Sequence, residues 1–137
     1  MDSLIRFAKK QYQNYNDNKV IDKICYKEKN SYEKRLAEST SILKKYPERV
    51  PIICERLTSK VPLLDRTKYL CPKDLNMGNF LFVIRKRLKL ESEQAIYLFV
   101  NNTMLPVSKD LGLIYEMHKD KDGFLYIRYD FETTFGL

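Results

Sequence analysis

The apolar residues of one segment in the second half of the chain, residues 77–88, set the strongest limit on the fold. They recur every three or four positions, which is the spacing of one face of an α-helix. Extended apolar stretches stand on both sides of this segment in the sequence. A helix in that place buries its apolar face by crossing over a sheet built from those stretches. The apolar face consists of Met77, Phe80, Leu81, Ile84 and Leu88, and the helix can be capped by Asp74 or Asn76.

Four segments have the composition of strands: residues 50–55, 68–72, 95–101 and 124–129. Pro51 indicates that the first strand begins near an edge or an end, and Asn101-Asn102 is a typical turn pair. A short helix at 110–118 is expected between the last two strands. The resulting order predicts an α+β fold, namely a ubiquitin-like β-grasp with a four-stranded mixed sheet and a crossover helix.

A further helix is predicted at residues 32–46, ahead of the first strand. Asn30 can cap it, with Glu33 in its first turn, and Pro47 ends it because proline disfavours a helical residue before it. Its expected buried stripe consists of Tyr32, Leu36, Ser39 and Leu43, with Ile42 at the side.

Residues 1–24 differ in composition from the rest and are interpreted as an N-terminal extension, either helical or flexible. Their apolar residues have helical spacing and would allow contact with a membrane or a partner, but a frayed, partly helical extension is the preferred interpretation. Arg6, Lys9 and Lys10 interrupt the first apolar residues, and no apolar run reaches the ~18 residues of a membrane span. We therefore expect a cytoplasmic protein.

The net charge of +7 is concentrated at the N-terminal end of the 137-residue chain. Residues 1–46 hold eleven basic and six acidic side chains, whereas residues 47–137 hold fourteen and twelve. Nucleic acid, anionic lipid and acidic peptides are all compatible with such a charge. The cluster Arg85-Lys86-Arg87 with Lys89 is either a solvated helix face, a contact for acidic peptides or a nucleic-acid contact.

No arrangement of residues typical of catalysis or cofactor binding is present in the sequence. Cys25, Cys54 and Cys71 are scattered, and with His118 as the single histidine they do not have the spacing of a metal site. Cys54 or Cys71 with His118 would be a minimal nucleophile and base, but buried reduced thiols are the better interpretation. We expect no enzymatic activity, no cofactor and no metal.

Two features indicate binding and attachment instead. Segment 68–72 has large apolar residues on both faces, and at a sheet edge its backbone would accept a peptide strand; ordinary core packing explains it as well. Gly136 lies one residue before the end of the sequence. A terminal glycine passes through a narrow enzyme channel because it has no Cβ, although Leu137 would first have to be removed.

Several long segments of this sequence resemble the GABARAP-type ubiquitin-like autophagy modifiers, the autophagy-related-eight family. The resemblance covers about residues 26–137 in nearly unbroken register. It is carried by YEKRLAES at 32–39, YPERVPIICE at 46–55, KYLCP at 68–72, FVIRKR at 82–87, HKDKDGFLY at 118–126 and TFG at 134–136.

This resemblance implies a β-grasp domain at 25–135 with two N-terminal helices, followed by a processed tail at 136–137. It implies that a cysteine protease cleaves after Gly136 and removes Leu137. Ubiquitin-like activating and conjugating enzymes would then join Gly136 to phosphatidylethanolamine. The lipid-linked protein would lie on autophagosomal or vacuolar membranes, act in autophagosome formation and dock cargo receptors.

The resemblance also implies two pockets for peptides with an aromatic residue, two variable residues and an aliphatic residue. Three arginines would face acidic residues near such motifs, and no nucleic-acid partner is expected. The pocket for the aromatic residue would use Glu38, Ile42, Pro51, Lys68, Leu70 and Phe124. The pocket for the aliphatic residue would use Tyr69, Cys71, Pro72, Leu75, Phe80 and Val83. The arginines are Arg49, Arg66 and Arg87.

Three departures from the family pattern bear on these expectations. Residues 1–21 have no counterpart in a typical member and inherit no role. Cys71 replaces a usual valine and makes the second pocket slightly smaller. The loop at 57–60 is one residue shorter. An adaptor that is never conjugated and a basic RNA-binding β-grasp domain are the alternative interpretations.

Overall fold

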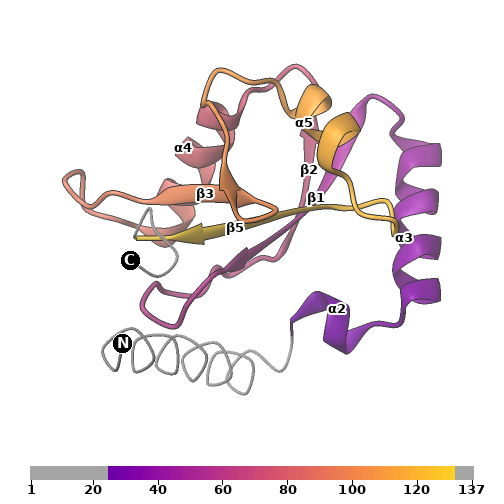
Figure 1. The fold of residues 1–137 in the computed structure, drawn as a ribbon, viewed down its shortest axis with the longest axis horizontal. Helices are drawn as coiled ribbons and strands as arrows, with labels where there is room; N and C mark the ends of the chain where they lie inside the picture. Colours follow the sequence, from indigo (N-terminus) through magenta and orange to yellow (C-terminus); the bar gives the residue numbers. More distant parts are fainter. Residues whose placement is uncertain (1–24, 132–137) are drawn as a thin grey trace, which may run out of the picture.

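The computed structural model describes residues 25–131, which form a five-stranded mixed sheet with helices on its two faces (Figure 1). The strand order is β2-β1-β5-β3-β4. β1 and β5 are parallel, and the other neighbours are antiparallel. The elements in chain order are α2 (Tyr26–Lys29), α3 (Tyr32–Lys45), β1 (Arg49–Arg56), β2 (Lys68–Pro72), α4 (Met77–Leu88), β3 (Tyr97–Val100), β4 (Thr103–Met104), α5 (Leu111–His118) and β5 (Leu125–Asp130).

The predicted β-grasp fold is confirmed, with α4 as the crossover helix between the two pairs of strands. The expected number of strands was one too low, because β4 adds a fifth. It follows the tight turn at Asn101 and Asn102, whose φ angles of 51° and 61° are left-handed, as in a type I′ hairpin. A strand of two exposed residues is too short to produce an alternating pattern, so it could not be predicted from the sequence.

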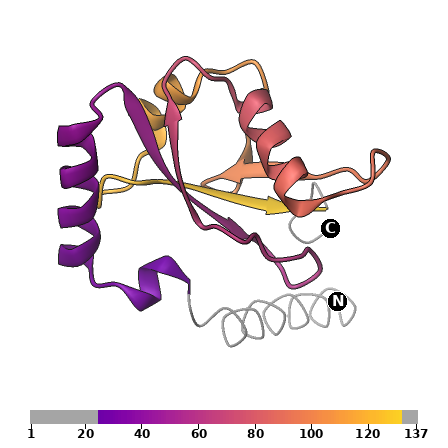
Figure 2. The same cartoon turned by 180° about the vertical axis from the view of Figure 1, so that it is seen from behind.

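The main core lies between the sheet and the helices α4 and α5, as the view from behind shows (Figure 2). Val50, Ile52 and Cys54 of β1 point into it and are 0–1% exposed. The predicted buried face of α4 is confirmed, since Met77, Phe80 and Ile84 are buried and Leu81 and Leu88 pack against the same core.

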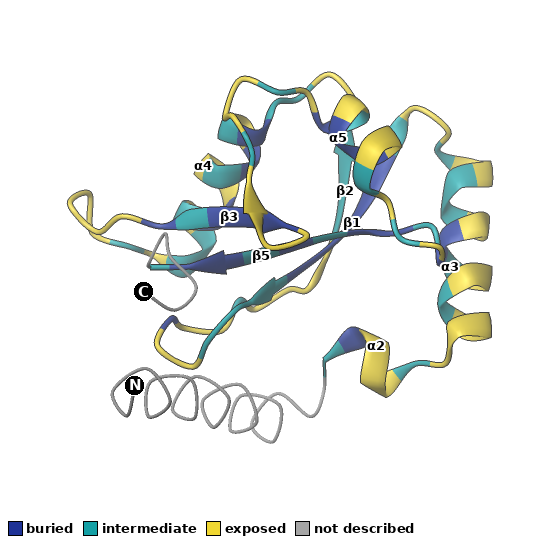
Figure 3. Cartoon of the chain, viewed as in Figure 1, coloured by how far each residue is buried: buried dark blue, intermediate teal, exposed yellow. Residues whose placement is uncertain are grey.

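A second, smaller core lies on the opposite face of the sheet, under α2 and α3. It consists of Tyr26, Ile53 and Phe124, with Ile42 and Tyr126 packed against it. Side chains of a strand point alternately to the two faces, so Ile53 of β1 reaches this core while its neighbours reach the main one. β1, β3 and β5 are mostly buried, whereas β2 is half-buried and β4 and one side of α3 are exposed (Figure 3).

Two details of α3 differ from the prediction. Its N-cap is Ser31, whose Oγ accepts a hydrogen bond from the Lys34 amide at 3.2 Å, whereas Asn30 ends α2. Both side chains suit a cap, and the short helix before α3 decides between them. Tyr32 and Leu36 are 42% and 38% exposed, so the predicted apolar stripe was wrong at its N-terminal end.

Pro51 lies in an internal strand, so the edge alternative was wrong and the end alternative is right. β1 pairs with β2 on one side and with β5 on the other. The pairing with β5 begins at Ile52, one residue after the proline. The missing N–H of Pro51 therefore removes no hydrogen bond from that ladder.

A buried ion pair anchors α3 to the turn before β5. Arg35 Nη1 lies 2.5 Å from Asp122 Oδ2, and the Asp122 side chain is 0% exposed. The Tyr126 hydroxyl donates to the same carboxylate at 2.5 Å, and the Phe124 amide donates to Oδ1 at 2.9 Å. Asp122 therefore has three donors of this chain around it, which satisfies a buried carboxylate. The position of α3 over the sheet depends on this network.

Candidate peptide-docking site

β2 is an edge strand of the sheet, as the docking hypothesis requires. Alternate residues of this segment exchange hydrogen bonds with the chain of its inner neighbour β1. At one end Cys54 N–H donates to the Thr67 carbonyl at 2.8 Å, and at the other Lys73 N–H donates to the Glu48 carbonyl at 3.3 Å. Because antiparallel ladders alternate, the backbone groups of Lys68 and Leu70 point away from β1. Each of these two residues offers one N–H and one C=O to an added strand.

The six residues predicted for the aromatic pocket all lie on the α3 side of the sheet around this edge. Leu70 is paired with Pro51 of β1. Lys68 Nζ forms an ion pair with Glu38 of α3 at 2.5 Å, which closes one end of this surface. The remaining members, Ile42 and Phe124, belong to the small core beneath it.

Tyr26 belongs to this surface and was missed in the sequence. Its ring packs edge-on against Phe124 with centroids 5.3 Å apart, and its hydroxyl donates to Glu38. The Lys68 ammonium lies 5.2 Å from the centre of the same ring. Burial raises the pKa of Tyr26, and the hydrogen bond to Glu38 raises it further. Tyr26 therefore covers Phe124, which is 1% exposed.

Glu38 stays ionised in this setting. Burial alone would raise its pKa, but the Lys68 ammonium and the Tyr26 hydroxyl outweigh burial and lower it. The edge of the surface therefore carries a fixed carboxylate that already has two donors.

The residues predicted for the aliphatic pocket lie on the α4 side of the same edge. The rings of Tyr69 and Phe80 meet edge-to-face, with centroids 5.5 Å apart. Cys71 and Leu75 pack against the same core, of which Phe80 is a buried member. Val83 on α4 is 38% exposed, so it presents apolar surface next to them. Pro72, half-buried at the end of β2, completes the predicted set.

Tyr69 has one polar group without a partner in the part of the chain that the structure describes. Its hydroxyl oxygen is buried and makes no hydrogen bond to any described residue. Burial raises the pKa of Tyr69 to about 12, so the hydroxyl stays protonated. A buried, unpaired hydroxyl reduces stability.

The three predicted arginines are in three different situations. Arg49 Nη1 donates to the Leu70 carbonyl at 3.4 Å. Arg87 donates to both carboxylate oxygens of Asp65, each at 3.1 Å. Arg66 is exposed and makes no ion pair or hydrogen bond within residues 25–131. Among these three arginines, Arg66 is therefore the one that the described part of the chain leaves without an ion pair or hydrogen bond.

The basic cluster on α4 is mostly engaged within the molecule. Arg85 donates to the carbonyl of Gln94 at 2.5 Å and to the carbonyl of Glu91 at 2.9 Å, so it holds the loop after the helix. The Lys86 ammonium lies 5.2 Å from the centre of the Phe82 ring. This arrangement favours a structural interpretation of the cluster over a nucleic-acid contact.

The cysteines have the features of structural thiols. Cys54 is buried, Cys25 and Cys71 are half-buried, and all three are free. Burial raises the pKa of Cys54 well above its ordinary value and raises that of Cys71 to about 11, so neither is a thiolate at neutral pH. The ring of His118 contacts Asn101 at 3.4 Å. In the described part of the chain, no cluster of three or more His, Cys, Asp or Glu residues is placed to hold a metal.

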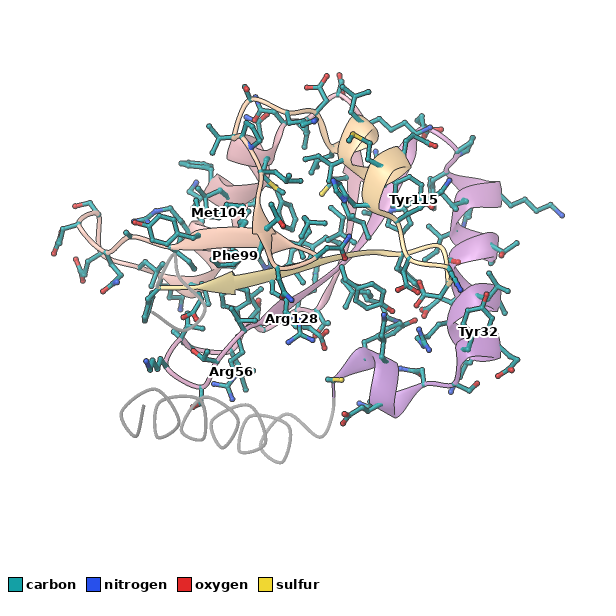
Figure 4. All side chains as sticks on the ribbon, in the orientation of Figure 1. Tyr32, Arg56, Phe99, Met104, Tyr115 and Arg128 are labelled. Atoms are coloured by element: carbon teal, nitrogen blue, oxygen red, sulfur yellow. The ribbon has the colours of Figure 1, made fainter. Side chains whose placement is uncertain are left out.

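A polar cavity of about 240 Å³ opens on the α2 side of the sheet, away from the predicted pockets. Phe99 of β3 and Arg128 of β5 lie close together in its wall near the centre of the sheet (Figure 4). None of the predicted docking residues lines it, and no sequence pattern predicted it. The other lining residues are Cys25, Lys27, Glu55, Asn101, Asn102 and Tyr126.

Gly136 and Leu137 lie outside the described residues, as do residues 1–24, so the predictions on the tail and on the N-terminal extension rest on the sequence. Among residues 25–131, none of the helices has the length and apolar character needed to cross a bilayer.

The fold and the open edge define the class of the protein. A β-grasp sheet with N-terminal helices is the architecture of a ubiquitin-like protein.

Comparisons with known proteins identify the family. Residues 34–136 match the family described as "Autophagy protein Atg8 ubiquitin like". Autophagy-related protein 8b of Arabidopsis thaliana is 52% identical over 117 residues, which cover 85% of this chain and 96% of the relative. Autophagy-related protein 8 of Kluyveromyces lactis is 50% identical over 115 residues, with 83% and 93% covered. The crystal structure of Trypanosoma brucei ATG8 is similar in fold, with a TM-score of 0.73, 42% identity and 77% and 91% of the two chains covered. The chain belongs to the Atg8 family of ubiquitin-like autophagy proteins.

Proposed function

We propose that this protein is a conjugated membrane tag and a docking adaptor in autophagosome formation, and that it acts by attachment and binding instead of catalysis. A cysteine protease removes Leu137, and activating and conjugating enzymes transfer Gly136 to the amine of phosphatidylethanolamine. The protein is cytoplasmic before this reaction and lies on autophagosomal or vacuolar membranes after it. Cargo receptors with aromatic-x-x-aliphatic motifs bind to its β2 edge.

The observation that carries the docking proposal is the combination of β2 as an edge strand with apolar surface on both of its sides. A peptide strand added to β2 can hydrogen-bond to the backbone of Lys68 and Leu70. Alternate peptide side chains then point to the two faces, one toward the Leu70 and Ile42 side and one toward the Tyr69 and Val83 side. Two faces with different pockets explain a motif with two specified residues.

The attachment proposal is supported by the extent of the family match. The matched region continues to residue 136 and leaves Leu137 outside. Gly136 has no Cβ, so its acyl carbon is unhindered for thioester exchange. Replacing Gly136 with Ala should abolish attachment in a reconstituted lipidation reaction without changing the thermal unfolding of the protein. A Gly136→Ala protein that is still lipidated would refute the assignment.

Docking is tested by calorimetric titration of a motif peptide into the Leu70→Ala variant. Leu70 lies at the centre of the edge, and we expect its truncation to weaken binding by roughly 1–3 kcal/mol, as for a central anchor. The matched control is Leu113→Ala on α5, because Leu113 is 58% exposed and lies on another element. Equal affinities of the two variants would remove Leu70 from the site.

A further inference from the structure

Arg66 and Arg87 are neighbouring basic residues at the β2 edge. Within the described residues, Arg87 has an acidic partner and Arg66 has none. Asp65 Oδ1 accepts a hydrogen bond from Arg87 Nε, and Asp65 Oδ2 accepts one from Arg87 Nη2, both at 3.1 Å. Arg66, the next residue in the chain, has no such partner among the described residues. Within residues 25–131, this loop therefore carries a guanidinium without an acidic partner, that of Arg66, beside a carboxylate, that of Asp65, which is paired with Arg87.

The pairing of Arg87 has the form that a bound acidic ligand would also use. Two parallel N–H···O bonds between a guanidinium and a carboxylate are the preferred geometry of this pair. The guanidinium also lies 5.9 Å from the centre of the Tyr69 ring, so it stands beside the aliphatic pocket. An acidic side chain of a ligand that approaches Arg87 finds the guanidinium already paired with the Asp65 carboxylate.

The pair is accessible enough to be exchanged. The Asp65 side chain is 67% exposed and the Arg87 side chain is 30% exposed. An exposed ion pair contributes little free energy, so an acidic ligand can displace Asp65 from Arg87. The free energy that the ligand gains from Arg87 is then reduced by the loss of the Asp65 pair.

We propose that Asp65 is a specificity-determining residue that competes intramolecularly with acidic ligand residues for Arg87. An acidic residue of a docked peptide is consequently bound by Arg66, and one that faces Arg87 contributes little. This inference rests on the proposed docking of peptides at β2. It assigns to Asp65 the role of selecting where the charge of a ligand must lie.

The test compares two peptides of the aromatic-x-x-aliphatic type, one with acidic residues on both sides of the motif and one with the corresponding amides. Fluorescence anisotropy at low salt gives the affinities. We expect Asp65→Asn to bind the acidic peptide about two- to fivefold more tightly than the unmodified protein, the range for an exposed pair. The amide peptide should bind both proteins equally, and the gain should disappear in the double variant Asp65→Asn/Arg87→Gln.

A second comparison uses the protein with Asp65 in place. Arg66→Gln should weaken binding of the acidic peptide, whereas Arg87→Gln should leave it nearly unchanged. Equal losses for these two variants would overturn the proposal, as would an Asp65→Asn gain of the same size for both peptides. If the unmodified protein binds neither peptide, the proposed docking itself fails together with this inference.

Discussion

The buried ion pair between Arg35 and Asp122 gives the sharpest prediction about the fold. Replacing Asp122 with Asn keeps the shape of the side chain but removes its charge. The amide has one oxygen for three donors, so at least one donor loses its partner, and the Arg35 guanidinium is left without a counter-charge. Breaking one partner of a buried pair costs roughly 3–5 kcal/mol, and we expect Asp122→Asn to lose at least the lower value.

Asp120, two residues earlier in the same turn, is a matched control. It pairs with Lys27 at 2.7 Å, but the two side chains are 28% and 46% exposed. We expect Asp120→Asn to lose about 1 kcal/mol or less, as exposed pairs do. Urea unfolding at neutral pH measures both free energies of unfolding, with unchanged m-values as the check on two-state behaviour. If the two variants lose the same amount, the argument from burial is refuted.

Three other predictions follow from single contacts. Tyr69→Phe removes a buried, unpaired hydroxyl and should leave the free energy of unfolding unchanged or raise it by about 1 kcal/mol, as urea unfolding would measure; a clear loss would mean that the hydroxyl has a partner. Gly123→Ala should cost about 1–3 kcal/mol in the same assay, because φ is +92° and an added Cβ would lie 2.3 Å from Ser39 Oγ; a neutral result would contradict this geometry. The pKa of Glu38 is lowered by Lys68, so its ionised form stabilises the fold at neutral pH, and this stabilisation is lost as the pH falls through the folded-state pKa. The Tm difference between the unmodified protein and Glu38→Gln should therefore vanish in acid, and a constant difference would exclude the ion pair as its source.

The regular elements could be predicted from the sequence because each has a periodic or punctuating signal. The apolar spacing of α4 predicted its buried face, and Asn76, one of the two residues proposed as its cap, does cap it with a reciprocal bond to Asn79. The elements that were missed or misjudged depend on tertiary contacts. Tyr32 is exposed, whereas Ser39 of the same helix is buried against the turn at Gly123, and no pattern along the helix reveals which residue is buried by a turn distant in sequence.

The docking edge was predictable in part. Segment 68–72 has apolar residues on both faces, a pattern that left peptide docking at a sheet edge and ordinary core packing equally open, and the structure places this strand at the edge. The covering of Phe124 by Tyr26 and the pairing of Arg87 with Asp65 were not predictable, because they join residues 22 or more positions apart through side chains of several possible partners. Charge and composition show that basic groups are present, and only the structure shows which of them are occupied.

The central claim is attachment through Gly136, and the intact mass of the membrane-associated protein from starved source cells tests it most directly. The account predicts a mass that lacks Leu137 and includes one phosphatidylethanolamine, with fragmentation placing the lipid on Gly136. A membrane-associated chain that retains Leu137 and carries no lipid would contradict the claim and favour an adaptor that is never conjugated.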